Sequence, residues 1–501
     1  MKTELWFKLQ NGSDIRGVAL EGIDTEAVNL TAEIANCIGQ AFARWLSERL
    51  NKPIEQLRIS VGRDSRISGP DLSERLCEGM LAKQSAVTDF GLASTPAMFM
   101  STVEAVPPFD GAVMITASHL PFNRNGFKFF TAEGGLEKQD ISEVLTLASS
   151  FSPISSSLKP NQLDFMADYA AGLVKKVREA IAHPSDYQQP LKGLKIIVDA
   201  GNGAGGFFVD RVLKPLGADT TGSQFLEPDG SFPNHVPNPE NATAMQSIQN
   251  AVLQHQADFG IIFDTDVDRS AAVDHQGNEL NRNKLIALIS AILLKQHPGA
   301  TIVTDSVTSD GLTDFIEHQL KGQHHRFKRG YKNVINEAIR LNEQGIFTPL
   351  AIETSGHAAL KENYFLDDGA FLITKLLIEL AKAKLNQQSL GDLIASLKEP
   401  VEGDEIRYQI QQADFKGYGQ SVLDHLTQWL ESQADWHAVP KNHEGIRVQC
   451  GAEDEQGWFL LRLSLHDPVI VLNVESDVKG GVTRILERLQ GFMGSFDLTV
   501  I

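Results

Sequence analysis

Short apolar runs alternate along the chain with longer stretches in which apolar residues recur at helical spacing. This alternation is typical of α/β domains whose strands are largely parallel. The apolar runs predict strands at residues 57–61, 112–115, 195–198, 260–263, 301–303 and 350–352. The helical spacing predicts helices at residues 26–50, 72–83, 165–181, 244–254, 284–294 and 370–383.

Three of the predicted strands run directly into polar loops. The strand at 112–115 is followed by TASHLPFNRNG, the strand at 260–263 by DTDVDRS, and the strand at 350–352 by ETSGHAAL. In α/β proteins, ligands bind at the carboxyl ends of the strands. The pattern therefore predicts three related α/β units around a shared cleft.

Three stretches are candidate boundaries between domains. A segment rich in Ser and Pro at 149–162 has the composition of a linker, and turn-forming residues gather at 274–283 and near 397–405. After the third stretch the pattern changes, with strand-like runs at 446–449, 458–464 and 469–474. This change predicts a small α+β domain at the C-terminal end.

Composition and charge narrow the class of protein. The chain has 501 residues, of which 42% are hydrophobic and 22% charged, so we expect a folded protein of three or four domains. The net charge of −19 disfavours nucleic acid as a partner, because an acidic chain repels a phosphate backbone. A small phosphorylated ligand stays open if Arg and Lys gather around it.

Several features predict a cytoplasmic protein without a membrane partner. The three cysteines, Cys37, Cys77 and Cys450, are far apart and lack CxxC spacing, so neither a disulfide framework nor a zinc site is expected. The first residues lack the apolar core of a signal peptide. The longest apolar run, 285–294, is about half the length of a membrane span.

The acidic loop DTDVDRS is the first candidate site. Asp264, Asp266 and Asp268 alternate directly after a strand, and carboxylates this close repel one another unless a cation lies among them. Hard oxygen ligands suit Mg²⁺ or Ca²⁺. An EF-hand is excluded, because Arg269 and His275 stand where that loop needs Gly and Glu. A solvated acidic turn is the other interpretation.

The loop TASHLPFNRNGFKFF is the second candidate site. It carries Ser118 beside His119, with Lys128 ten residues further on. A single serine is normally an unreactive surface hydroxyl. Near a Mg²⁺ site and basic groups it becomes a candidate phosphoryl acceptor, because a serine hydroxyl can hold a phosphoryl group as a covalent intermediate.

The loop ETSGHAAL is the third candidate site. Glu353, Ser355 and His357 stand at alternating positions, so in an extended segment their side chains face the same way. Glu and Ser together can hold vicinal sugar hydroxyls, and His can move a proton or donate to phosphate. A surface turn with a solvated His stays possible.

Basic residues stand in several short turn-like segments of this acidic chain. They include Arg16, Arg63, Arg66, Arg329, Lys332 and Arg462. Such residues are candidate phosphate contacts. A surface salt bridge is the other interpretation of each.

Together these motifs resemble one family. TASHLPFNRNGFK, DTDVDR, ETSGH and a late RLS segment that ends at Pro468 resemble the motifs of the α-D-phosphohexomutases, in particular the phosphomannomutase/phosphoglucomutase group. Further matching pieces are DIRG at 14–17, GRDSRISG at 62–69, STPA at 94–97, DAGNGAGG at 199–206, PDGSFPNHVPNP at 228–239 and GYKNV at 330–334. The motifs keep the family's order over nearly the whole chain, so their joint occurrence is highly specific.

The resemblance implies an α/β fold of four domains around a central cleft. Three are related α/β units with mixed sheets, and the fourth is a small α+β domain. The serine loop would lie in domain I (1–160), the metal loop in domain II (161–278), the sugar-binding loop in domain III (279–398), and the phosphate-binding loop in domain IV (399–501).

The resemblance also implies roles for single residues. Ser118 would be a phosphoserine whose phosphate adds a ligand to one Mg²⁺ per chain, bound by Asp264, Asp266 and Asp268. Arg269 would follow the metal loop into the active site. Arg16, Lys128 and His357 match positions proposed to assist proton transfer or to stabilise charge. Substrate contacts are implied for His119, Lys332, Glu353, Ser355, Arg462 and Ser464.

Two motifs depart from the family pattern. The phosphate loop is usually R-x-S-[GN]-T-E-P, but here Leu465 replaces the small residue and His466 replaces the threonine. His466 could still donate a hydrogen bond to phosphate, whereas Leu465 has only its backbone N–H to offer. The serine loop has Leu120 where the family usually has Asn.

The implied activity is an intramolecular phosphotransferase, a phosphohexomutase. It moves a phosphoryl group reversibly between C1 and C6 of mannose or glucose phosphate, through phospho-Ser118 and a hexose 1,6-bisphosphate that is both intermediate and activator. Phosphoglucosamine mutase and a Mg-dependent sugar phosphatase are alternatives, and the altered phosphate loop alone favours a sugar-phosphate-binding regulator without activity. A kinase is disfavoured, because no nucleotide-binding motif is visible. The oligomeric state stays open.

Overall fold

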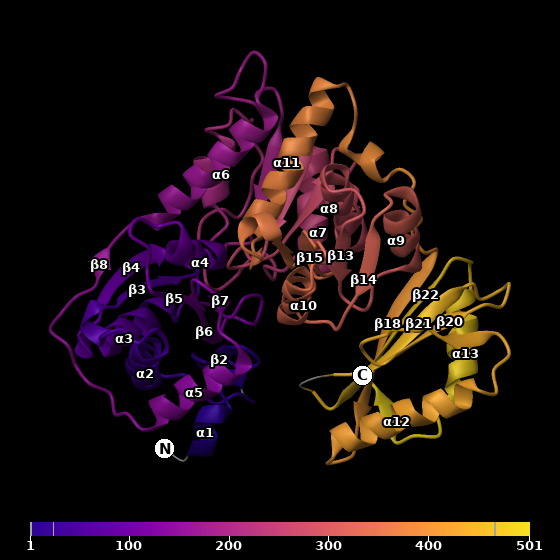
Figure 1. Ribbon diagram of the computed structural model, residues 1–501, viewed down its shortest axis with the longest axis horizontal. Coiled ribbons are helices and arrows are strands. Elements are labelled where there is room, and N and C mark those ends of the chain that lie inside the picture. Colours follow the sequence, from indigo (N-terminus) through magenta and orange to yellow (C-terminus); the bar gives the residue numbers. More distant parts are fainter. Residues whose placement is uncertain (1–2, 24, 465–466) are drawn as a thin grey trace. The chain divides into compact units, whose positions relative to one another are not determined.

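The computed structural model describes residues 3–23, 25–464 and 467–501 and divides the chain into two compact units, whose elements are labelled in Figure 1. Unit 1 comprises Met1–Asn281, Ser355–Ala358 and Leu366–Leu390. Unit 2 comprises Arg282–Thr354, Ala359–Phe365 and Gly391–Ile501. Each unit is therefore assembled from more than one stretch of the chain.

The first part of unit 1 is a mixed sheet with helices packed against it. The strands are β1 (Gln10–Asn11), β2 (Asp14–Val18), β3 (Arg58–Arg63), β4 (Ala86–Leu92), β5 (Gly111–Ile115), β6 (Arg124–Thr131), β7 (Gly134–Gly135) and β8 (Asn161–Gln162). The helices are α1 (Thr3–Phe7), α2 (Ala32–Leu50), α3 (Gly69–Ala82), α4 (Thr95–Val103) and α5 (Lys138–Ser149), with a 3₁₀ turn at Ile54–Gln56. The strand order is β1-β2-β6-β5-β3-β4-β8, with β7 beside β6. Because β3 is parallel to β5, the loops that follow these two strands lie at one edge of the sheet.

The predicted elements of this part are confirmed, with one corrected boundary. The strands predicted at 57–61 and 112–115 are β3 and β5, and the helix predicted at 72–83 is α3. The helix predicted at 26–50 begins only at Ala32, because the side chain of Thr31 caps it by accepting the Ile34 N–H at 3.4 Å. Glu26 lies before this cap and forms an ion pair with Arg124 instead.

Two glycines let α2 and α3 cross with their backbones in contact. A Cβ on Gly39 would lie 2.2 Å from the carbonyl oxygen of Leu76, and a Cβ on Gly79 would lie 2.1 Å from that of Asn36. No larger residue fits at either position without moving a backbone. The close crossing brings α2, α3 and α5 into one apolar core with the sheet.

The second part of unit 1 has a four-stranded sheet. Its strands are β9 (Ile196–Asp199), β10 (Phe259–Phe263), β11 (Ser270–Asp274) and β12 (Glu279–Leu280), in the order β12-β11-β10-β9. Its other elements are α6 (Phe165–Ile181), a π-helical turn (Val209–Leu213), α7 (Ala242–His255), β17 (Leu366–Asp367) and α11 (Gly369–Leu385). The Tyr169 hydroxyl of α6 donates to Asp368, at the start of α11, at 2.7 Å, and the two helices lie side by side (Figure 1). The predicted strands 195–198 and 260–263 and helices 165–181, 244–254 and 370–383 are confirmed.

Unit 2 begins with another α/β arrangement. Its elements are α8 (Arg282–Gln296), β13 (Thr301–Thr304), α9 (Asp310–Asp314), a π-helical turn (Phe315–Gln319), β14 (Gln323–Arg326), α10 (Tyr331–Glu343), β15 (Leu350–Ile352), β16 (Ala358–Leu360) and 3₁₀ turns at Lys361–Asn363 and Leu390–Ile394. Strand β13 is parallel to both β14 and β15. The predicted helix at 284–294 and strands at 301–303 and 350–352 are confirmed. No helix among the described residues is long and apolar enough to cross a membrane.

The C-terminal part of unit 2 is an antiparallel sheet with two helices, which confirms the expected α+β domain. Its strands are β18 (Glu402–Ile410), β19 (Trp436–Ala438), β20 (Ile446–Cys450), β21 (Gly457–Leu463), β22 (Val469–Ser476) and β23 (Leu498–Val500), in the order β19-β20-β21-β22-β18-β23. The helices α12 (Phe415–Leu430) and α13 (Gly481–Met493) share an apolar core with this sheet. The strands predicted at 446–449, 458–464 and 469–474 are β20, β21 and β22.

A buried arginine joins this C-terminal sheet to the preceding part of unit 2. Arg447 on β20 donates to the carbonyl oxygens of Ser306 and Thr308, both at 3.1 Å, and to the carboxylate of Asp310 at 2.9 Å. Its guanidinium stacks on Trp458, 3.5 Å from the ring centroid. These contacts fix the C-terminal sheet against the loop that follows β13.

We expect Gly79→Ala to destabilise the first part of unit 1 by about 1–3 kcal/mol, because the added methyl overpacks the crossing of α2 and α3. Gly172→Ala on α6 is the matched control. No heavy atom lies within 4 Å of a Cβ there, so it should stabilise its helix by about 0.5–1 kcal/mol. Thermal unfolding of both variants checks this prediction, and an unchanged melting temperature for Gly79→Ala would contradict it.

Candidate active site

Ser118 lies in the loop after β5, in a conformation that the loop holds with backbone contacts. It is 3% exposed, and its φ of 51° falls in the left-handed region. Its N–H donates to Thr116 Oγ1 at 2.8 Å, and the Thr116 hydroxyl donates to Asp64 Oδ2 at 2.7 Å. Asp64 follows β3, the parallel neighbour of β5, so the sheet order brings these residues together. Burial raises the pKa of Asp64 to about 6, against the opposing charge of Arg66.

Arg66 holds the serine loop through hydrogen bonds to its backbone and does not bind phosphate. Its guanidinium is completely buried and lies 3.3 Å from the carboxylate of Asp64. It donates to four backbone carbonyls of the loop, those of Ser118 at 2.5 Å, Leu120 at 2.6 Å, Pro121 at 2.8 Å and Arg124 at 2.9 Å. The interpretation of Arg66 as a candidate phosphate contact is therefore wrong, because both of its terminal nitrogens are bonded to the loop and its Nε faces Asp64.

The acidic loop connects β10 and β11, whose last and first residues, Phe263 and Ser270, are paired. The side chains of Asp264, Asp266 and Asp268 are buried, and one oxygen of each lies within 4.8 Å of the others. The Oδ1 atoms of Asp266 and Asp268 are buried and accept no hydrogen bond from the described residues. Burial and the two neighbouring carboxylates raise the pKa of Asp264 well above its ordinary value. Two buried carboxylate oxygens without a hydrogen-bond donor among the described residues fit a hard divalent cation such as Mg²⁺ as their partner.

Lys128 on β6 binds the same acidic loop. Its Nζ donates to Asp266 at 2.9 Å and to Asp268 at 2.5 Å. Burial alone would raise the pKa of Asp268, but Lys128 and His357 hold it below its ordinary value. Arg16 on β2 is paired with Gly126, two residues before Lys128, so the two basic side chains share one face of the sheet.

Arg269 connects the acidic loop to the serine. Its Nη2 donates to Ser118 Oγ at 3.0 Å and to Asp264 at 3.1 Å, and its Nη1 donates to Asn238 at 3.2 Å. The Ser118 hydroxyl in turn donates to Asp264 Oδ2 at 3.0 Å. The serine oxygen therefore lies between a carboxylate that accepts its proton and a guanidinium that stabilises negative charge on it.

His119 is neutral. Arg269 Nη2 donates to its Nδ1 at 2.7 Å, and because a guanidinium only donates, Nδ1 must be the acceptor and Nε2 must carry the proton. Burial and the charges of Arg269 and Arg16 lower the pKa of His119 to about 3. His119 can therefore donate a hydrogen bond through Nε2 but cannot serve as a cation.

His357 is a cation beside the acidic loop. It is bridged to Arg269 by backbone pairing, and its Nδ1 is bonded to Asp367 Oδ2. Burial alone would lower the pKa of His357, but the charges of Asp367 and Asp268 raise it to about 9. Asp268, His357 and Asp367 also lie close enough together to hold a metal ion. A protonated imidazole has no free lone pair for a metal, so this second group is a set of compensated charges.

The ETSGH loop departs from the expected extended geometry. It turns at Thr354 and Ser355, and Gly356 has a φ of 93°, so alternation along a strand does not apply. Glu353 is buried, and its Oε1 accepts the N–H of Gly330 at 2.6 Å. Lys332 lies in the first turn of α10. Glu353 and Lys332 belong to unit 2, whereas Ser355 and His357 belong to unit 1.

The predicted phosphate loop begins where β21 ends. Arg462 is 8% exposed, and burial lowers its pKa while the carboxylate of Glu444 opposes that effect. The N–H of Ser464 donates to the carbonyl of Val469 at 2.8 Å, which closes the base of the loop. Leu465 and His466, the two residues that depart from the family pattern, lie outside the described residues.

Four residues of these networks escaped the sequence analysis. They are Asp64, Thr116, Asp367 and Glu444, each of which holds a predicted site residue or its loop. For Asp64 and Thr116 the sequence held one usable signal, their position directly after a strand, where functional loops lie in α/β proteins. Asp367 and Glu444 carried no such signal.

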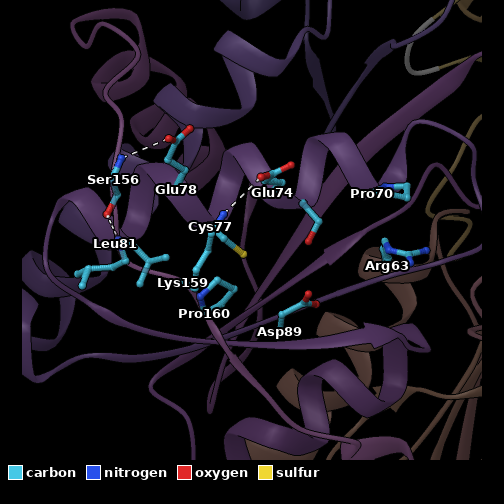
Figure 2. A pocket seen from close by; sticks show the side chains of 12 residues that line it. Arg63, Pro70, Glu74, Cys77, Glu78, Leu81, Asp89, Ser156, Lys159 and Pro160 are labelled. Atoms are coloured by element: carbon cyan, nitrogen blue, oxygen red, sulfur yellow. Dashed lines mark hydrogen bonds and ion pairs between the residues drawn. The ribbon is translucent and has the colours of Figure 1, made fainter.

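A pocket of about 240 Å³ lies elsewhere in unit 1, between α3 and the segment that leads to β8 (Figure 2). Cys77 lines it, but it is only 2% exposed, and burial raises the pKa of its thiol to about 12. Figure 2 shows Glu78 bonded to Ser156, whose N–H donates at 3.2 Å. Arg63, another candidate phosphate contact, also lines this pocket. The thiol is unreactive at neutral pH, so the chemistry is better placed at Ser118.

Comparisons with known proteins point to one family. Family models described as phosphoglucomutase/phosphomannomutase, alpha/beta/alpha domains I, II and III, match residues 8–149, 167–277 and 281–400. A phosphomannomutase/phosphoglucomutase of Pseudomonas putida is 32% identical over 94% of this chain and 92% of its own. A phosphoglucomutase of Neisseria meningitidis serogroup A is 28% identical over 96% of both chains. The crystal structure of a phosphoglucomutase/phosphomannomutase family protein from Burkholderia thailandensis matches with a TM-score of 0.77, 26% identity and 99% coverage of both chains.

We expect an NMR titration of the His357 imidazole to give a pKa of about 9, with assignment by His357→Gln. In Asp367→Asn the pKa of His357 should fall towards or below 6.5, because the carboxylate that most strongly opposes the effect of burial is gone. A pKa raised by folding stabilises the protein fully below the unfolded value and loses that effect as pH rises through the folded one. The free energy of unfolding that Asp367 contributes through His357 should therefore decline between pH 6.5 and about 9. Equal His357 pKa values in both proteins would rule out the charge pair.

Proposed function

We infer the activity of this chain from its family, because the chain belongs to the α-D-phosphohexomutases, whose domain models match most of its length. It is a phosphohexomutase, an enzyme that interconverts hexose phosphates. The names of its relatives combine phosphomannomutase and phosphoglucomutase activity. We therefore propose the 1- and 6-phosphates of mannose and glucose as its substrates.

The proposed reaction moves a phosphoryl group between C1 and C6, with Ser118 as the carrier. Phospho-Ser118 gives its phosphoryl group to the free hydroxyl of the hexose phosphate. The bond from Oγ to phosphorus breaks as the sugar oxygen bonds to phosphorus and loses its proton. The resulting hexose 1,6-bisphosphate then returns its other phosphoryl group to Ser118, which regenerates the enzyme. Added hexose 1,6-bisphosphate would activate unphosphorylated enzyme in the same way.

One observation carries this proposal, the position of Ser118 Oγ between Asp264 and Arg269, at 3.0 Å from each partner atom. A serine oxygen that accepts a phosphoryl group must be positioned and lose its proton, and the hydrogen bond to Asp264 Oδ2 fixes the position of that hydroxyl. The same oxygen becomes negative when the phosphoryl group leaves. Arg269 donates directly to it and so stabilises the leaving alkoxide.

We propose that one Mg²⁺ per chain binds to Asp264, Asp266 and Asp268, with the phosphate on Ser118 as a further ligand. Two buried carboxylate oxygens of this loop accept no hydrogen bond from the described residues, which supports a cation as their partner. When bound, the ion neutralises charge on the transferring phosphoryl group. Lys128 balances the rest of the loop's negative charge.

The remaining residues of unit 1 would handle protons and charge. His357 is protonated at neutral pH, so it can donate a proton or stabilise the phosphoryl oxygens. Arg16 shares the sheet face of Lys128 and would add a second positive charge. His119 would donate a hydrogen bond to the substrate through Nε2, because its Nδ1 is held by Arg269.

The other substrate contacts are proposals that follow from the family. Glu353 and Ser355 would hold sugar hydroxyls, and Lys332 would contact the substrate beside them. Arg462, Ser464 and His466 would hold the phosphate that does not react. A sugar that binds in two orientations needs one fixed phosphate contact and hydroxyl contacts that serve both orientations, and this division of roles provides them.

We also propose a cytoplasmic setting for the enzyme. Cys37, Cys77 and Cys450 are all unpaired and buried, which is in keeping with a reducing compartment. The proposed ligands are small hexose phosphates, without nucleic acid or membrane as partners.

Incubation with glucose 1,6-bisphosphate should add one phosphate to the enzyme, at Ser118, as seen by intact mass and peptide mapping. Ser118→Ala should take up none and should lose mutase turnover, because it lacks the hydroxyl that bonds to both Asp264 and Arg269. Ser152→Ala, an exposed serine of the same part of unit 1, is the control and should behave as wild type. Full mutase turnover in Ser118→Ala would falsify the scheme.

The same assay separates the alternatives. Steady release of inorganic phosphate from glucose 1-phosphate, without glucose 6-phosphate, would instead identify a phosphatase. Binding of hexose phosphates without turnover would identify a regulator.

Thr116→Val should lower kcat about 10- to 100-fold, the range expected for losing a hydrogen bond to a charged group. The change removes the link from Asp64 to the Ser118 N–H, but it leaves the volume of the side chain nearly unchanged. KM should change little, because Thr116 contacts the loop and not the substrate. Thr116→Ser keeps the hydroxyl and should stay close to wild type. Steady-state kinetics of both variants check this, and equal kcat values would show that the link is dispensable.

A further inference from the structure

Arg462 is the residue before the last of β21, and it is buried with an unsatisfied donor. It is 8% exposed, and its Nε has no hydrogen-bond partner among the described residues. The segment before β20 runs directly against it. A Cβ on Gly445 would lie 2.8 Å from both Cα and Cβ of Arg462, so only glycine fits there. A buried guanidinium with an unused donor calls for an anionic partner.

A second arginine is attached to the same segment. Glu444, the neighbour of Gly445, accepts the backbone N–H of Arg329 at 3.1 Å and the hydroxyl of Ser306. These contacts tie the loop before α10 to the segment that covers Arg462. The charge of Arg329 is close enough to Arg462 to help lower its pKa, after the larger effect of burial. The guanidinium groups of Arg329 and Arg462, which are distant in sequence, thus lie near each other in unit 2.

Carboxylates around Arg329 orient its guanidinium from a distance. Its Nε lies 3.9 Å from Asp305 Oδ2, and its Nη1 lies 3.8 Å from Glu405 Oε2. Asp305 accepts closer hydrogen bonds from Thr354, one of them at 2.7 Å, and Glu405 accepts one from Arg407 at 2.8 Å. These carboxylates therefore also accept hydrogen bonds from nearer donors, and their charges orient the Arg329 side chain.

We propose that Arg329 and Arg462 together hold the phosphate group that does not react, with Arg329 as a second substrate-binding guanidinium. A phosphate dianion carries two negative charges, which two arginines match, and each arginine presents a planar fork of donors to phosphate oxygens. This inference rests on the proposed function, since it assigns a further residue to the same substrate.

The proposal explains how an altered phosphate loop can still bind its ligand. Leu465 stands where the family usually has a small residue, and it brings no side-chain donor. Arg329 supplies a charged donor from another part of unit 2. The residue after it, Gly330, donates its N–H to Glu353 at 2.6 Å, so the proposed hydroxyl contact is bonded to the residue next to the proposed phosphate contact. Their spacing is set by a short, anchored segment.

The test compares Arg329→Ala, Arg329→Lys and a control, Lys295→Ala, which removes one positive charge from an exposed end of α8 in unit 2. Arg329→Ala should raise KM for both glucose 1-phosphate and glucose 6-phosphate about 10- to 100-fold, with kcat within about threefold. Both substrates are affected because one fixed contact serves both orientations. Arg329→Lys should fall between, because an ammonium keeps the charge but not the fork. Lys295→Ala should match wild type.

A binding measurement separates this inference from the proposed function. Titration calorimetry of glucose 6-phosphate uses Ser118→Ala and Ser118→Ala/Arg329→Ala, in which turnover cannot occur. The double variant should bind about 10- to 100-fold more weakly. Equal affinities, or a KM effect on only one substrate, would overturn the role of Arg329 and leave the mutase assignment intact. Weaker binding by the double variant, together with no mutase turnover in the wild-type chain, would keep the role of Arg329 and reject the proposed reaction.

Discussion

Three buried carboxylates on one short loop are the constraint around which unit 1 is organised. Asp264, Asp266 and Asp268 cannot all be ionised in a buried site without compensating charge, because each raises the free energy of the others. Lys128 and Arg269 supply part of that charge as direct partners. The carboxylate oxygens without a hydrogen-bond partner among the described residues are suited to a divalent cation. The same negative charge that must be compensated for the loop to be buried is therefore what would bind the cation.

The serine is placed by the backbone more than by its own side chain. Arg66 binds four carbonyls of the loop, and Asp64 reaches the Ser118 N–H through Thr116. A loop held in this way keeps the left-handed conformation of Ser118, which an L-residue rarely adopts unaided. In the proposed reaction, the hydroxyl would gain and lose a phosphoryl group while its position relative to Arg269 stays fixed.

In unit 2, too, a buried charge calls for a partner of opposite charge. Here Arg462 is a buried cation with an unsatisfied donor among the described residues, and Arg329 is a partly exposed neighbour whose nearby carboxylates also accept from other donors. Arg447 holds the C-terminal sheet against the loop after β13, so these two arginines belong to one anchored arrangement. An acidic chain can bind a phosphorylated sugar because a few buried cations, and not the net charge of −19, decide the local field.

The sequence by itself determined most strands and helices, because apolar periodicity is a local property. Its motifs predicted Ser118 and the three aspartates as site residues, and in unit 1 these side chains lie together. It misplaced the start of α2, whose cap at Thr31 depends on one hydrogen bond. It also left Arg66 open between a phosphate contact and a salt bridge, and the structure pairs Arg66 with Asp64. It also missed Asp64 and Asp367. Only the tertiary structure decided the partners, since Ser118 and Asp264 are 146 residues apart and meet through strand order and domain packing. The tertiary structure also decided the protonation of His357, because its charge depends on which carboxylates the fold brings beside it.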